Sequence, residues 1–127
     1  MQSPYDQSRL KSESKLYQGQ CLISKSKNYY AVLQSDGNFI VYVSCHFHPK
    51  NILWSSNTTG SGLNPYYLYC EKSGNLTLFD SKGKSLWATH TTNNGSPPYE
   101  LVMQDDGNLV FLDSTMKVLW STNTKRI

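Results

Sequence analysis

Three tryptophans, each 33 residues from the next, constrain this 127-residue chain more than any other feature. Each follows a leucine in one of three similar blocks, and a Gly-Asn pair stands upstream of each block. The blocks are Leu53-Trp54-Ser55-Ser56-Asn57-Thr58, Leu86-Trp87-Ala88-Thr89-His90-Thr91 and Leu119-Trp120-Ser121-Thr122-Asn123-Thr124. Recurrence at a fixed period indicates one supersecondary unit that buries its apolar face against its neighbours. The sequence therefore predicts three internal repeats, at about 29–59, 66–92 and 99–124.

Each repeat has the pattern of a β-hairpin followed by a third strand that carries the tryptophan. In the first repeat, Asp36-Gly37 lies between β-branched and aromatic residues, which is a strong hairpin signal. No window shows a helical stripe. Each sheet alone would be too small to be stable. We predict an all-β domain in which three short antiparallel sheets pack around a shared axis.

The alternation of side chains along a strand assigns the two faces of each sheet. The predicted inward pairs, one pair for each repeat, are Phe39 and Val41, Leu76 and Leu78, and Leu109 and Phe111. The three tryptophans are predicted to belong to the core rather than to a ligand platform, because tryptophan is usually mostly buried.

The spacing between the Gly-Asn pair and the tryptophan sets the domain organisation. It is 16 residues from Asn38 to Trp54 but 12 in the other repeats, so four extra residues lie in the segment 44–51. Insertions belong in loops. Residues 1–14 are polar and lie outside the repeat, which predicts a loose tail. Residues 15–127 are predicted to form one domain.

The composition favours an uncharged polar ligand. Ser, Thr and Asn number 36 residues, against 21 charged residues. The net charge is +3 and the basic residues are scattered along the chain, whereas a nucleic-acid binder gathers its basic residues on one face.

The longest apolar run, 39–43, is too short to span a bilayer. Because the first ten residues contain no apolar secretory segment, we expect either a cytoplasmic protein or an extracellular or mucosal one that leaves without a signal peptide.

One set of outward side chains has the chemistry of a sugar site. With Phe39 and Val41 inward, the residues Asn38, Ile40 and Tyr42 face outward, and the hairpin brings Gln34 and Asp36 beside them. Two amides, a carboxylate and a phenol can donate to and accept from neighbouring hydroxyls, while the isoleucine meets a C–H face. Turn capping alone accounts for Asp and Asn. It does not account for the Gln and the aliphatic residue, which recur as Gln104, Asp106, Asn108 and Val110.

These residues resemble a known family. The series Gln34-x-Asp36-x-Asn38-x-Ile40-x-Tyr42 is similar to the mannose-binding motif Gln-x-Asp-x-Asn-x-Val-x-Tyr of the monocot bulb-type, or lily-type, lectins. The Leu-Trp blocks and the segment 16–22 match the same family, so that the resemblance covers about residues 15–127. In its layout the chain is most similar to the lily-type lectins of fish skin mucus.

The resemblance implies a β-prism II fold, with three four-stranded sheets around a pseudo-threefold axis. It also implies that Asp36 and Asn38 hold the axial O2 of mannose, Gln34 the O3 and Tyr42 the O4, with Ile40 against C3 and C4. Isoleucine in place of valine narrows the pocket by about one methylene group.

The other repeats depart further from the motif. In the third, Leu112 replaces the tyrosine, and one lost hydrogen bond costs about 0.5–1.5 kcal/mol, so we expect a weaker site there. In the second, only the asparagine remains and the site is expected to be inactive. The second-repeat residues are Glu71, Ser73, Asn75, Thr77 and Phe79.

The three cysteines, Cys21, Cys45 and Cys70, cannot all pair within one chain. Spacing leaves open one disulfide with a spare thiol, or three thiols. The family's usual disulfide does not carry over, because Gly37 stands where many plant members have a cysteine; a pair between Cys70 and Cys45 stays open.

Seven residues follow Trp120, which leaves little strand for the exchanged dimer of some members. The oligomeric state stays open, a homodimer included.

Four other interpretations of the sequence are weaker. A glycosidase needs two carboxyls about 5–10 Å apart, whereas Asp36 and Asp106 belong to separate repeats. A zinc site at Cys45, His46 and His48 needs three or four ligands in a tetrahedral array, and close neighbours in an extended loop point apart. A β-trefoil usually has a longer repeat. A structural or protein-interaction module with degenerate sugar sites is the main alternative.

The sequence thus predicts a lectin, that is, a carbohydrate-binding protein that is not an enzyme. We expect it to need no cofactor and no metal. Its partners are expected to be mannose or mannosylated glycans on glycoproteins or microbial surfaces, as in innate defence, with no nucleic acid and no membrane insertion.

Overall fold

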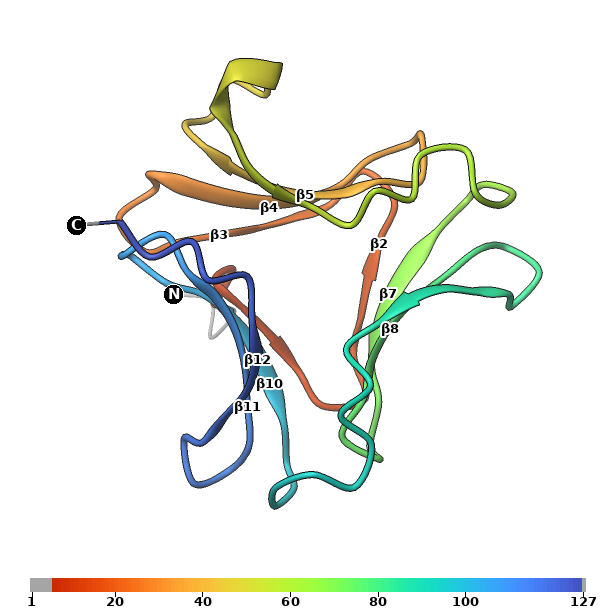
Figure 1. Cartoon of the computed structure of the whole chain (residues 1–127), viewed down its shortest axis with the longest axis vertical. Helices are drawn as coiled ribbons and strands as arrows, with labels where there is room; N and C mark the ends of the chain where they lie inside the picture. Colours follow the sequence, from red (N-terminus) through yellow and green to blue (C-terminus); the bar gives the residue numbers. More distant parts are fainter. Residues whose placement is uncertain (1–5, 127) are drawn as a thin grey trace, which may run out of the picture.

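The computed structural model describes residues 6–126, which form three four-stranded antiparallel sheets. Seen down its shortest axis, the molecule is a triangle with one sheet along each side (Figure 1). Sheet A contains β1 (Arg9–Lys11), β10 (Glu100–Met103), β11 (Leu109–Leu112) and β12 (Val118–Ser121), in that order. Sheet B contains β2 (Lys15–Tyr17), β7 (Tyr67–Cys70), β8 (Leu76–Phe79) and β9 (Ser85–Ala88). Sheet C contains β3 (Cys21–Ile23), β4 (Tyr29–Leu33), β5 (Phe39–Val43) and β6 (Ile52–Ser55).

The predicted fold class is confirmed, and each repeat builds the last three strands of one sheet. In the first repeat β4 and β5 pair from Tyr29 opposite Val43 to Leu33 opposite Phe39, and β6 then brings Trp54 opposite Val41. The second and third repeats have the same order and the same antiparallel pairing. The chain therefore closes a prism from three copies of one motif.

The core lies between the sheets, as the alternation of side chains predicts. All six predicted inward residues of the hairpins are fully buried in one cluster. The three tryptophans pack against this cluster and against one another, with ring centroids 5.2–5.5 Å apart in edge-to-face contacts. Such contacts favour aromatic packing beyond the area that they bury. The interpretation of the tryptophans as core residues is confirmed.

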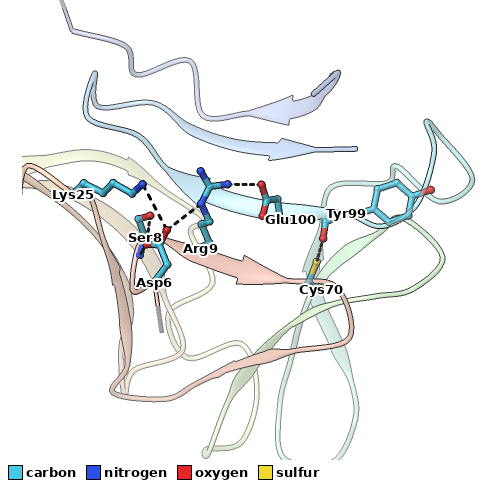
Figure 2. A network of polar contacts seen from close by, with 7 residues as sticks. All are labelled: Asp6, Ser8, Arg9, Lys25, Cys70, Tyr99 and Glu100. Carbon is cyan, nitrogen blue, oxygen red and sulfur yellow. Dashed lines mark hydrogen bonds and ion pairs between the residues drawn. The ribbon is translucent and has the colours of Figure 1, made fainter. Parts of the chain in front are cut away.

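The prediction of a loose polar tail at 1–14 is wrong for residues 9–11, whereas its first five residues lie outside the part of the chain that the structure describes. Strand β1 pairs with β10, and Leu10, 6% exposed, enters the shared core. Arg9 lies between the carboxylates of Asp6 and Glu100 (Figure 2). The strands β1, β2 and β3 follow one another along the chain, and each completes a different sheet. A three-residue strand carries too few side chains to show an alternating pattern.

The hairpin turns explain why the Gly-Asn pair recurs. Gly37 has a φ of +91°, and a Cβ placed there would lie 2.8 Å from the Tyr66 ring, which begins the next repeat. Gly74 has the same relation to Tyr99, with a φ of +97° and a distance of 2.8 Å. Both the left-handed backbone and the close approach exclude larger residues. The glycine thus serves the contact between one sheet and the next.

The suggested pairing of Cys45 with Cys70 is wrong. Cys45 is exposed in the inserted loop of sheet C, whereas Cys70 is buried at the end of β7 in sheet B, and both thiols are free, as is that of Cys21. The Cys70 thiol points to the carbonyl oxygen of Tyr99, 3.9 Å away (Figure 2). Burial, with the nearby charges of Glu100 and Glu71, raises the pKa of the Cys70 thiol to about 12. A buried thiol of this kind is inert.

Candidate functional site

The five motif side chains of the first repeat lie on the outer side of sheet C, around the β4–β5 hairpin. Ile40 and Tyr42 belong to a small apolar cluster with Val32, separate from the core between the sheets. Gln34 and Asp36 are in the turn, where the backbone N–H of Gln34 donates to the carbonyl oxygen of Asn38 at 3.0 Å. The tight turn therefore brings an acid, two amides and a phenol together on one hairpin.

Each polar group of this set uses one part of its side chain within the protein. Oδ1 of Asp36 accepts from the Asn38 backbone N–H at 2.9 Å, and Nε2 of Gln34 donates to the Tyr42 hydroxyl at 2.8 Å. Oδ1 of Asn38 accepts from the Ser55 and Ser56 hydroxyls, both at 3.0 Å. Among the described residues, Oδ2 of Asp36, Nδ2 of Asn38, Oε1 of Gln34 and the Tyr42 O–H have no protein partner. Two acceptors and two donors thus remain for a ligand.

The carbonyl of the repeated asparagine also has a structural role, which the motif alone does not reveal. In the first repeat Oδ1 of Asn38 accepts from the backbone N–H of Thr58 at 3.2 Å, and the Thr58 hydroxyl donates to the carbonyl of Gly37 at 2.7 Å. The same pair of bonds recurs at Asn75 with Thr91 and at Asn108 with Thr124. The threonine at a constant place in each Leu-Trp block was the available signal.

The inserted loop covers one end of the first-repeat group. The Phe47 ring is stacked on Tyr42, with centroids 4.9 Å apart and planes at 27°, and meets Tyr30 edge-on at 5.7 Å. Tyr42 is consequently only 3% exposed, whereas Phe47 is 45% exposed. Sequence reasoning placed the insertion in a loop but could not show that it folds back over the motif.

The second-repeat group is internally satisfied. Nδ2 of Asn75 donates to the Thr77 hydroxyl at 3.1 Å, and the Thr77 hydroxyl donates to a carboxylate oxygen of Glu71. Phe79 stacks on Tyr67 with centroids 5.3 Å apart. The amide nitrogen that is free in the first repeat is therefore occupied here.

The third-repeat group lies beside an open cavity of about 400 Å³ on sheet A. Gln104, Asp106 and Leu112 line it, with Arg9 and Lys25 from the N-terminal part of the chain. Lys25 and Arg9 both approach the Asp6 carboxylate, at 3.9 and 3.1 Å (Figure 2). Oδ1 of Asp106 accepts from the Asn108 backbone N–H at 2.9 Å, as in the first repeat. Leu112 and Val110 are buried in an apolar cluster and supply no hydroxyl.

Two buried carboxylates that the sequence analysis did not single out hold turns. Oδ1 of Asp113 accepts from the backbone N–H groups of Thr115 and Lys117, both at 2.9 Å, and Oδ2 from that of Ser96 at 2.9 Å. The hydrogen bond from the Ser96 backbone makes the largest contribution to lowering the pKa of the Asp113 carboxyl to about 2. Asp80 has the same place in the second repeat and also has a lowered pKa. Their recurrence 33 residues apart was a usable signal.

Neither a metal centre nor a long helix occurs in the part of the chain that the structure describes. Across residues 6–126, no group of three or more His, Cys, Asp or Glu side chains is placed to hold a metal ion. His48 instead precedes the short 3-10 helix η1 (Pro49–Asn51), where its Nδ1 accepts from the backbone N–H of Lys50 at 3.4 Å. Among the same residues, no helix has the length and apolarity to cross a membrane.

Solved structures similar to this one are lectins. The structure named "Japanese Marasmius oreades lectin" is 31% identical over 95% of this chain and 93% of that one, with a TM-score of 0.81. A monomeric monocot mannose-binding lectin from Gastrodia elata is 26% identical over 93% of this chain and 98% of its own, with a TM-score of 0.80. The Polygonatum cyrtonema lectin, solved with monomannoside, is 30% identical over 94% of this chain and 99% of its own, with a TM-score of 0.73. No protein-family model matches the chain, and no curated protein does.

The triangular arrangement of three four-stranded sheets, with polar hairpin turns on the outside, defines a β-prism II lectin. The chain belongs to the family of monocot mannose-binding, or bulb-type, lectins. The similarity to fish lectins within this family stays a prediction.

Proposed function

We propose that this protein is a non-catalytic lectin that binds mannose or mannose-containing glycans, with its main site on the outer side of sheet C. The observation that carries the proposal is the set of two acceptors and two donors on Gln34, Asp36, Asn38 and Tyr42 that have no partner among residues 6–126. A sugar hydroxyl both donates and accepts, and its desolvation is offset only where each lost bond to water is replaced. Ile40, which is 4% exposed, lies in the apolar cluster beneath these groups and would form the floor against which a pyranose C–H face packs.

The proposed contacts follow the family motif residue by residue. Oδ2 of Asp36 and Nδ2 of Asn38 accept from and donate to the axial O2 of mannose, and Gln34 contacts O3. The Tyr42 hydroxyl donates to O4, while Ile40 packs against C3 and C4. The already ordered Gln34–Tyr42 bond of 2.8 Å lowers the entropic cost of binding, because both side chains are held before the sugar arrives.

We propose that Gln104, Asp106, Asn108 and Val110 form a second, weaker site of the same kind. Its polar turn repeats that of the first repeat, and the neighbouring cavity of about 400 Å³ leaves room for a hexose. The missing tyrosine hydroxyl at Leu112 removes one hydrogen bond, which is worth about 0.5–1.5 kcal/mol. The closed network of Asn75, Thr77 and Glu71 argues against a site in the second repeat.

Shallow single-sugar sites of this kind bind with a Kd of about 1 mM, that is, about 4 kcal/mol. Useful affinity for mannosylated glycoproteins or microbial surfaces then comes from several sites acting together. We propose that two sites on one chain, or further sites in a homodimer, supply this multivalency.

The test separates the two ends of the Asn38 amide. Asn38→Asp keeps an oxygen that accepts from Thr58, Ser55 and Ser56 but removes the Nδ2 donor. We expect a folded protein whose affinity for methyl α-mannoside at the first site falls at least tenfold. Affinity is measured by calorimetric titration in an Asn108→Asp background. The third-repeat site there lacks its own amide donor, so the titration reports on the first-repeat site alone.

The matched control is Asn75→Asp, the same chemical change at the equivalent position of the second repeat, and it should leave mannose affinity within about twofold. One specific observation favours the alternative of a structural module, because the asparagine carbonyl holds the same turn in all three repeats, the closed second one included. If mannose perturbs no amide resonance in the chain, the structural alternative is correct. If mannose binds but Asn38→Asp binds it as well as the parent chain, the assignment of the main site to the first repeat is wrong.

A further inference from the structure

The inserted segment 44–51, called the platform below, is a loop held by hydrogen bonds between its own residues. Nδ2 of Asn51 donates to the carbonyl of His46 at 2.9 Å, and the backbone N–H of Asn51 donates to the carbonyl of His48 at 2.8 Å. The 3-10 turn η1 closes the segment before β6 begins. Figure 1 shows this loop standing away from the outer side of sheet C, above β4 and β5.

Phe47 is the exposed aromatic residue of this platform. One face of its ring is stacked on Tyr42, at 4.9 Å between centroids, and Tyr30 contacts it edge-on. Nevertheless 45% of Phe47 is exposed, so the ring face away from Tyr42 is open to solvent. The stacking holds that face at a defined place on the surface.

The place is next to the proposed mannose site. The Tyr42 ring beneath Phe47 belongs to the side chain whose hydroxyl is bonded to Gln34 at 2.8 Å. An open apolar ring thus borders a group of free hydrogen-bonding atoms. A sugar residue has the matching character, because one face of a pyranose presents C–H groups while its edge presents hydroxyls. Removing both apolar surfaces from water is favourable.

We propose that Phe47 forms a second subsite, which packs against the C–H face of the sugar residue joined to the mannose held by Gln34, Asp36, Asn38, Ile40 and Tyr42. The inference rests on the proposed mannose binding and extends it from a single sugar to a disaccharide unit. It makes the first-repeat site selective for linkages that direct the second residue over the Tyr42 end.

The other repeats lack this subsite. Where sheet C has the insertion, sheets B and A have tight turns organised by Asp80 and Asp113. The residues of these turns, 80–84 and 113–117, include no aromatic side chain. The four extra residues of the first repeat therefore give one of the three hairpins a distinct ligand preference.

The experiment compares methyl α-mannoside with a set of α-linked mannobiosides by calorimetric titration, with Asn108→Asp as the background so that the third-repeat site is silenced. In the parent background we expect at least one mannobioside to bind about tenfold tighter than the monosaccharide, a gain of about 1.4 kcal/mol. In Phe47→Ala this gain should fall to less than twofold, while monosaccharide affinity changes by less than twofold. Phe47→Trp should keep or increase the gain.

Two further variants control for indirect effects. Tyr17→Ala removes an aromatic side chain that is 54% exposed on sheet B and should keep the full mannobioside gain. Phe47→Leu keeps apolar cover on Tyr42 but has no flat ring, and should lose most of the gain while folding like the parent.

The outcomes separate the subsite from the function on which it rests. If neither sugar binds, mannose recognition and the subsite are both wrong. If the monosaccharide binds but every mannobioside binds equally well, only the subsite is wrong. If Phe47→Ala and Phe47→Leu weaken both sugars by the same factor, Phe47 merely positions Tyr42 and the subsite is again wrong.

Discussion

At the scale of single residues, the repeated asparagine holds a turn in every repeat, beside the binding role that we propose for Asn38. The carbonyl of the repeated asparagine bonds to a threonine N–H at 3.2 Å in all three repeats, so the fold by itself explains why this asparagine recurs. Whether an asparagine of this set can contact a ligand is indicated by the side chains around it. In the described part of the chain, no residue accepts from the Asn38 amide nitrogen, whereas the Thr77 hydroxyl accepts from that of Asn75.

Asp113 makes stability depend on pH. Hydrogen bonds from the Ser96 backbone and from Thr115 and Lys117 hold the pKa of the Asp113 carboxyl at about 2, below its usual 3.8. An acid with a lowered folded-state pKa stabilises the fold above its unfolded pKa and loses that contribution as it is protonated. We therefore expect the free energy of unfolding to fall between about pH 4 and pH 2, as measured by urea titration at a series of pH values.

The control for this pH dependence is Asp113→Asn, which keeps a carbonyl acceptor but cannot titrate. Its free energy of unfolding should be lower than that of the parent at pH 7 and should depend less steeply on pH below 4. Equal slopes for the two proteins would assign the acid sensitivity to other carboxylates, Asp80 and Asp6 among them, whose pKa values are also lowered.

At the scale of elements, the short strand β1 contributes more to the fold than its length suggests. It supplies the fourth strand of sheet A, and its central residue, Leu10, is buried in the core shared by all three sheets. Its pairing with β10 extends one residue before the strand, since the N–H of Met103 donates to the carbonyl of Ser8 at 2.8 Å. Termini that are tied down in this way are ordered parts of a domain.

Leu10→Ala tests whether β1 belongs to the folded unit. Truncating a buried leucine removes apolar contacts and leaves a cavity, which costs about 2–5 kcal/mol. We expect a loss of this size in the free energy of unfolding, measured by urea denaturation. Leu63→Ala, at a leucine that is 58% exposed, should change stability by less than about 0.5 kcal/mol. A Leu10→Ala protein as stable as the Leu63→Ala protein would mean that the segment before residue 15 is dispensable.

At the scale of the whole molecule, the connections between strands join the three sheets to one another. The consecutive strands β1, β2 and β3 tie sheet A to sheet B and sheet B to sheet C. Backbone bonds also tie the connections between these strands to the sheet that follows. The Glu13 N–H donates to the carbonyl of Cys70 in sheet B at 2.7 Å, and the Gly19 N–H to that of Leu33 in sheet C at 2.8 Å. The three tryptophans then meet on the axis, one from each sheet.

We accordingly expect a single unfolding transition. Tryptophan fluorescence reports on the contact among Trp54, Trp87 and Trp120, whereas far-ultraviolet circular dichroism reports on all three sheets. The two urea curves should coincide in midpoint and slope, because no sheet keeps its core once the others separate. Tryptophan fluorescence that changes at clearly lower urea than the dichroism would show that the axis opens while sheets persist.

The sequence by itself determined the fold class, the three repeats and the inward residues. These follow from patterns within single segments, since alternation places Phe39 and Val41 on one face whatever lies elsewhere, and a 33-residue period states that one motif is used three times. The motif residues around Asp36 and Asn38 could be proposed for the same reason, because a tight hairpin brings them together locally.

Only the tertiary structure decided the position of β1, the separation of Cys45 from Cys70 and the stacking of Phe47 on Tyr42. Each depends on which distant segment a residue meets. A three-residue strand acquires its conformation from the partner that accepts its hydrogen bonds, and a loop residue takes up its place from the surface on which it packs. Local propensity contains neither piece of information.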